Sequence, residues 1–142
     1  MNFPEEIDIN KFVKCKRISR DSFSVRFQVK DKKTGQFYQA FVYDIDNDQM
    51  KERIFKNIIP IMNLANYPTI IKFIGYSKTD FSGEEKTTII TEFVSELSLY
   101  DLINKVQKSE CPPKYTNTTR QIIMIGIASG IKCLHDLGII HS

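Results

Sequence analysis

The stretch TTRQIIMIGIASGIKCLHDLGIIHS, residues 118–142, decides the fold of this chain. Its apolar residues recur at helical spacing, which predicts an amphipathic helix of about five turns over residues 118–137. Thr118 and Gln121 have the spacing of a capping box, so we expect the helix to begin there. Gly138 suits the left-handed position that ends a helix, and we expect the helix to end at it. The apolar stripe comprises Ile122, Ile125 (or Met124), Ala128, Ile131 and Leu134.

Composition limits the class of protein. The chain has 142 residues, of which 42% are hydrophobic and 26% charged, as in one soluble globular domain or part of a larger one. A net charge of +3 is too small to favour a nucleic-acid partner. No apolar run approaches the roughly 18 residues of a membrane span, and the acidic start is not a signal peptide. The three cysteines have no metal-like or redox-like spacing. These features predict a cytoplasmic protein that binds neither nucleic acid nor membrane.

The rest of the chain predicts strands and helices in separate blocks. Five stretches are rich in β-branched and aromatic residues or alternate in polarity, and we expect each to be a strand. A helix capped within residues 46–48 should run to Lys56, with Glu52 and Lys56 as a favourable pair. Pro60 should break it, and Leu99–Lys108 should form another helix. This order is typical of an α+β fold. The expected strands are residues 12–18, 23–29, 36–44, 68–76 and 87–93.

Four segments carry a resemblance to a known family. In their order and spacing they resemble eukaryotic-type protein kinase domains, over roughly residues 12–142. The resemblance implies a small lobe, an antiparallel sheet of about five strands plus one helix, followed by two helices of an incomplete large lobe. The segments are PTIIKFIGY (68–76), IITEFV (89–94), LSLYDLI (97–103) and GIASGIKCLHDLGIIH (126–141).

The resemblance also implies domain boundaries. Residues 1–11 would be an N-terminal tail, residues 12–94 the small lobe with the segment joining the lobes, and residues 95–142 the start of the large lobe. His141 matches the histidine of the family's catalytic loop, and Ser142 stands at the following arginine. The catalytic aspartate would come after this sequence, so we expect no catalytic residue and no metal ligand within it.

ATP and Mg²⁺ are the cofactors that the family resemblance implies. Thr91 would be the gatekeeper residue of the joining segment. The main-chain carbonyl of Glu92 and the amide of Val94 would face the edge of the adenine. The residues assigned in this way to the adenine side are Ile18, Phe23, Thr91, Glu92 and Val94.

The phosphate-binding hairpin departs from the family pattern. A kinase covers the phosphates with glycines, because only glycine lets the main-chain amides come close. Here Ser19, Asp21 and Ser24 stand at the three glycine positions, and a carboxylate at residue 21 would repel phosphate. Arg26 stands where the family has a valine that packs on adenine.

The family's ion pair is also missing. With Gln39 at the position of an alanine, Phe41 falls where the phosphate-binding lysine belongs, and a register one residue later gives Ala40 and Val42. Strand alternation places Gln39 and Phe41 on the face that would line the nucleotide site. The glutamate partner of the lysine falls at Ile58. An apolar pair would therefore replace the ion pair, which avoids leaving one charge buried alone.

Three functions remain open at this point. The departures favour a catalytically inactive, pseudokinase-like module for regulation or interaction, with weak or no ATP binding. If the chain is a fragment of a longer protein, it could instead belong to an ATP-dependent kinase that phosphorylates Ser, Thr or Tyr. A truncated product without independent function is the third. We expect a protein partner, or self-association through the apolar face of residues 118–140, because exposed apolar patches commonly mark interaction sites.

Overall fold

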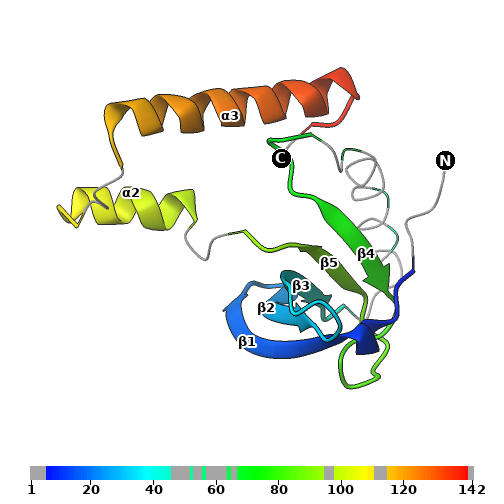
Figure 1. The fold of residues 1–142 in the computed structure, drawn as a ribbon. Coiled ribbons are helices and arrows are strands. Elements are labelled where there is room, and N and C mark those ends of the chain that lie inside the picture. Colours follow the sequence, from blue (N-terminus) through cyan, green and yellow to red (C-terminus); the bar gives the residue numbers. More distant parts are fainter. Residues whose placement is uncertain are drawn as a thin grey trace. The chain divides into compact units, whose positions relative to one another are not determined.

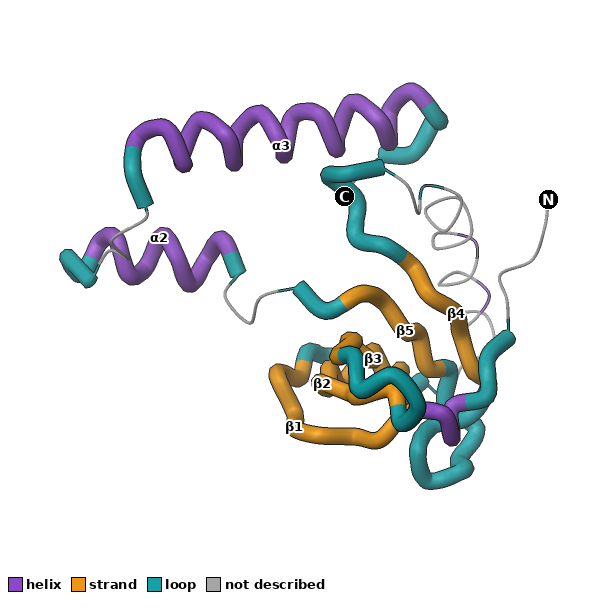
Figure 2. Tube along the Cα trace, viewed as in Figure 1, coloured by secondary structure: helices purple, strands orange, loops and turns teal. Residues whose placement is uncertain are grey.

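The computed structural model describes residues 6–45, 52, 56, 64, 67–94, 98–110 and 115–140. The chain divides into two units, Met1–Val94 and Ser95–Ser142. The first unit is built on a β-sheet, and the second contains two helices (Figures 1 and 2).

The sheet of the first unit has five strands. Every neighbouring pair is antiparallel, in the order β1-β2-β3-β5-β4. The predicted α+β fold with a five-stranded antiparallel sheet followed by two helices is thus confirmed. The strands are β1 (Phe12–Arg20), β2 (Ser24–Asp31), β3 (Phe37–Tyr43), β4 (Phe73–Ser77) and β5 (Thr88–Glu92).

The turn between β2 and β3 is made by Asp31 and Gly35. The Asp31 carboxylate accepts hydrogen bonds from the amides of Lys33 (2.8 Å) and Thr34 (2.7 Å). Gly35 has φ +74°, a left-handed conformation that glycine adopts without steric cost. The predicted hairpin is therefore present, and its residue types explain its geometry.

A core lies on one face of the sheet. Val29, Ala40 and Ile90, from three adjacent strands, are fully buried, and Ile9 and Phe12 pack with them. Ile9 belongs to a short 3₁₀ helix, η1 (Ile9–Lys11). Residues 9–12 therefore lie against the sheet, because Ile9 and Phe12 are apolar and are buried there.

Strand β4 begins later than expected. We expected it from residue 68, but it starts at Phe73. Residues 68–70 form a turn, in which the amide of Ile70 donates to the carbonyl of Tyr67 at 3.0 Å. Pro68 has no amide to give to a sheet and favours a turn. The apolar residues of this segment favoured a strand, and the turn was therefore not predicted.

Helix α2 (Leu99–Gln107) agrees with the predicted helix within one residue. It begins with a capping box: the Ser98 hydroxyl accepts from the amide of Asp101 at 3.1 Å, and the Asp101 carboxylate accepts from the amide of Ser98 at 3.0 Å. These bonds satisfy main-chain amides that an uncapped helix would leave open.

Helix α3 (Asn117–Asp136) corrects the expected starting point of the C-terminal helix. The cap is Thr116 rather than Thr118, because the hydroxyl of Thr116 accepts from the amide of Thr119 at 3.2 Å. Its end is as predicted: Gly138 has φ +71° and donates to the carbonyl of His135, and Ile139 donates to that of Leu134. This pair of bonds is a Schellman motif.

Several expectations fall outside the described residues. They include most of the helix before Pro60, the expected contact between Phe41 and Ile58, and His141. Glu52 and Lys56 are described; both are helical, and their side chains form the predicted ion pair at 3.0 Å. Within the described parts of the chain, no helix is long and apolar enough to cross a membrane. The same parts hold no cluster of three or more His, Cys, Asp or Glu residues that could bind a metal ion.

Candidate functional site

Strand β3 places two of the residues singled out from the sequence on one face of the sheet. In the register of the ladder, Gln39 lies opposite Thr91 of β5 and Phe41 lies opposite Ile89. Directly opposed residues of an antiparallel pair project to the same side. Gln39, Phe41 and Thr91 therefore share a face, and it is not the face of Ala40 and its core.

The hairpin between β1 and β2 is organised by the carboxylate of Asp21. Its Oδ1 accepts from the amides of Phe23 (2.8 Å) and Ser24 (2.7 Å), and its Oδ2 accepts from the Ser24 hydroxyl at 2.8 Å. These bonds, led by the one from Phe23, lower the pKa of Asp21 below its ordinary value of 3.8. By the resemblance, this turn corresponds to the family's glycine-rich hairpin. Its amides donate their hydrogen bonds to the carboxylate of Asp21.

The chain should lose stability in acid through this hairpin. Because the folded-state pKa of Asp21 lies below 3.8, its contribution is complete above that pH and is lost as the pH falls through the lower folded value. The hydrogen bond from the amide of Thr34 likewise lowers the pKa of Asp31, so the contribution of Asp31 to stability is also lost in acid. We expect the urea midpoint of Asp21→Asn to fall less than that of the wild type between pH 5 and about pH 2.

Asp31→Asn is the matched control for this measurement. It removes the other described aspartate with a lowered pKa, in a turn of similar construction. Each single variant should lose part of the acid sensitivity, and the double variant should lose both parts. An Asp21→Asn profile parallel to that of the wild type would contradict the assignment.

Phe41 of β3, one of the two residues that the resemblance could put at the lysine position, is half-buried. Phe41 lies directly opposite Arg26 of β2. The Nε of Arg26 is buried and has no hydrogen-bond partner among the residues that the structure describes. The charge of Arg26 acts on Asp21, whose pKa it helps to lower. Phe41, which the resemblance puts at the lysine position in one of two registers, is thus an aromatic ring beside Arg26.

At the end of β5, main-chain and side-chain groups are already bonded within the protein. Thr91 is only 6% exposed as a residue, and its hydroxyl donates to the carbonyl of Glu92 at 3.1 Å. The Glu92 carboxylate accepts from the amide of Lys72 at 2.7 Å, and the amide of Glu92 donates to the carbonyl of Lys72 at 2.9 Å. The carbonyl of Val94 accepts from the side-chain amide of Gln39 at 2.8 Å.

The residues assigned to the adenine side fall into two groups. Thr91, Glu92 and Val94 are consecutive or nearly so at the end of β5. Ile18 lies in β1 at a break in the ladder register, and Phe23 lies in the hairpin with 52% of its surface exposed. Strands β2 and β3 lie between β1 and β5 in the sheet. Whether these five residues contact a nucleotide stays a prediction.

Gln39 was placed at an alanine position by the sequence, but its bond to Val94 was not foreseen. The two residues are 55 positions apart, and no local pattern links them. One feature of the sequence did point to such a bond. A glutamine stands in place of an alanine on the face of the expected site, and a buried side-chain amide needs a hydrogen-bond partner.

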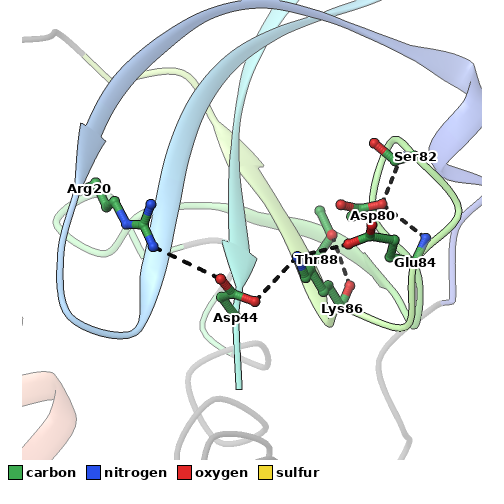
Figure 3. Close-up of polar contacts among 7 residues, drawn as sticks. All are labelled: Arg20, Asp44, Asp80, Ser82, Glu84, Lys86 and Thr88. Atoms are coloured by element: carbon green, nitrogen blue, oxygen red, sulfur yellow. Dashed lines mark hydrogen bonds and ion pairs between the residues drawn. The ribbon is translucent and has the colours of Figure 1, made fainter. Parts of the chain in front are cut away.

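A second polar cluster lies where β1 and β3 end and β5 begins (Figure 3). Asp44 pairs with Arg20 at 4.0 Å and with Lys86 at 3.2 Å, and Lys86 also pairs with Glu84 at 2.8 Å. Asp80 accepts from the amides of Ser82 and Glu84. The side chains of these ion pairs are partly or well exposed, so solvent screens the pairs and each contributes little to stability. We assign the cluster to fixing the loop that leads into β5.

Comparison with known proteins agrees with this arrangement. The profile of the family described as protein tyrosine and serine/threonine kinase matches residues 16–142. A probable myosin light chain kinase from Dictyostelium discoideum is 28% identical over 126 residues, covering 89% of this chain and 36% of that protein. A serine/threonine-protein kinase from Drosophila persimilis is 23% identical over 124 residues, covering 87% and 15%. Another from Rattus norvegicus is 24% identical over 133 residues, covering 94% and 16%.

The sheet, the two helices and the family match define the class. This chain belongs to the protein tyrosine and serine/threonine kinase family. It spans between 15% and 36% of the length of these three relatives. The family uses ATP and Mg²⁺ in general.

Proposed function

We propose that this chain is a kinase-family module that regulates or binds other proteins and does not itself transfer phosphate. The proposal rests on the hairpin between β1 and β2, where the Asp21 carboxylate accepts hydrogen bonds from the amides of Phe23 and Ser24. Phosphoryl transfer depends on placing and neutralising the phosphates. An anion of the protein stands at the amides that would do this, and a phenyl ring stands at the lysine position.

The two substitutions reinforce each other. ATP would have to displace a carboxylate with a lowered pKa, which therefore remains ionised near neutral pH. It would also lack the ammonium that offsets its charge, because Phe41 is apolar. Both effects weaken the interaction with the phosphates, so nucleotide binding should be weak or absent.

Mg-ATP should leave the melting temperature of the purified chain unchanged at about 0.1 mM. A ligand at a hundred times its dissociation constant stabilises a protein by about 2.7 kcal/mol. For a domain of this size such a gain raises the melting temperature by several degrees, which differential scanning fluorimetry detects. A clear upward shift at this concentration would contradict the expectation of weak binding.

A phosphotransfer assay with radiolabelled Mg-ATP tests the function directly. Neither the chain itself nor a generic protein substrate should become labelled above a sample without protein. Labelling that disappears in a boiled sample and tracks the purified chain would overturn the proposal.

A second candidate is an ATP-dependent protein kinase of which this sequence is one part. The fraction of each relative that the chain covers favours it, since that fraction does not exceed 36%. The same assay on the complete gene product distinguishes the candidates. If sequence after residue 142 supplies an aspartate and a metal site, the complete product would incorporate label.

We also propose that the chain works in the cytoplasm with a protein partner, or a second copy of itself, on the apolar face of residues 118–140. In α3 the buried residues are Gly130, Cys133 and Leu134. Ile122, Met124 and Ile125 are each more than 60% exposed. Apolar surface gathered on one helix in this way commonly marks an interaction site.

A further inference from the structure

We propose that the side chain of Gln39 occupies the place of a nucleotide base and closes that end of the site from within. The inference rests on the proposed function and deepens it, because it concerns the base end of the site rather than the phosphate end. It assigns to Gln39 the role of excluding an adenine-type base.

The position of Gln39 supports this role. Only 2% of the residue is exposed, although it is polar and lies on the sheet face away from the main core. It lies opposite Thr91, the last buried residue of β5, and its side chain reaches beyond that neighbour to the carbonyl of Val94. The side chain therefore lies along the segment from residue 91 to residue 94.

The chemistry of the contact matches that of a base. An adenine offers N–H donors at its edge, and a segment that leaves a sheet presents main-chain carbonyls that need such donors. The carboxamide of Gln39 is a planar group with N–H donors, and it donates one of them at 2.8 Å. A residue of the chain thus supplies the kind of bond that a bound base would make.

A base can enter only by displacing this group. It would have to break the bond to Val94 and expose or relocate a buried amide, which needs a new partner. Alanine at residue 39, the residue type at the corresponding family position, would remove both obstacles. The volume of the Gln39 side chain and its hydrogen bond to Val94 therefore both oppose the binding of a base.

The test uses adenosine, because it has a base but no phosphates and so is insensitive to the carboxylate of Asp21. We expect Gln39→Ala to bind adenosine about tenfold more tightly than the wild type, as measured by titration calorimetry or ligand-observed NMR. Gln28→Ala is the matched control. Gln28 lies opposite Gln39 on β2, and the substitution also replaces a glutamine by an alanine. It should bind adenosine as the wild type does.

Equal affinity of the wild type and Gln39→Ala, or no binding by either, would overturn the inference. A measurement on the wild type alone covers the case in which the variant does not fold. The side-chain amide protons of Gln39 should exchange slowly with solvent and show a nuclear Overhauser effect to Val94. Fast exchange without that effect would also overturn it.

These outcomes are separate from those of the proposed function. Phosphotransfer by the wild-type chain would contradict the proposed function, whether or not Gln39 excludes a base. Equal adenosine binding without phosphotransfer would remove only the role of Gln39. Each idea therefore has its own failing result.

Discussion

Replacing Ile90 by alanine should lower the free energy of unfolding of the sheet unit by about 3 kcal/mol. Ile90 is fully buried in β5 and belongs to the core cluster with Val29 and Ala40. Removing three methyl or methylene groups from a packed interior loses their transfer free energy and leaves a cavity. The loss would be a large share of the roughly 5–15 kcal/mol that stabilises a typical domain. Urea unfolding followed by tyrosine fluorescence and circular dichroism measures it.

Ile122→Ala is the matched control for the core substitution. It deletes the same atoms from a side chain that is 63% exposed, on α3. Its free energy of unfolding should stay within about 0.5 kcal/mol of the wild-type value, as for most surface substitutions. A small effect of Ile90→Ala, or equal effects of the two variants, would show that the core lies elsewhere.

The isolated chain should self-associate at micromolar concentration, and Ile125→Lys should reduce this strongly. Ile125 is 68% exposed, and Ile122 and Met124 are exposed to a similar degree. At about 25 cal/mol per Å², covering even a few hundred Å² of apolar surface contributes several kcal/mol to association. A lysine in the contact would have to be desolvated, which opposes association. Sedimentation velocity over a range of concentrations measures the change.

His135→Lys serves as the control on the same helix. His135 is exposed in the last turn, where a cation is favoured by the helix dipole, and the change removes no aliphatic side chain. This variant should associate as the wild type does. A wild-type chain that sediments as a monomer and binds no hydrophobic dye would contradict the role assigned to this face.

Much of the candidate site could be anticipated from residue types at single positions. The carboxylate at residue 21 and the phenyl ring at residue 41 were recognisable because a kinase needs glycine and lysine there. Their meaning changed once the bonds were known. Asp21 was expected to repel phosphate, and it also accepts hydrogen bonds from the amides of Phe23 and Ser24, so the same carboxylate stabilises the hairpin.

By itself, the sequence determined the type and order of the elements. Alternation of polarity marks strands, helical spacing marks α3, and Gly138 marks its end, because each of these depends on residues close together in the chain. The order of the four resembling segments likewise indicated the family.

Only the tertiary structure decided how distant residues meet. It placed Ile9 in the core, started β4 at Phe73, and joined Gln39 to Val94 across 55 residues. Such contacts depend on the register between strands and on competition for buried partners, and a shift of one residue would turn every side chain of a strand to the other face. A polar side chain placed on a buried face must take the partner that the register brings to it. For Gln39 that partner is the carbonyl of Val94.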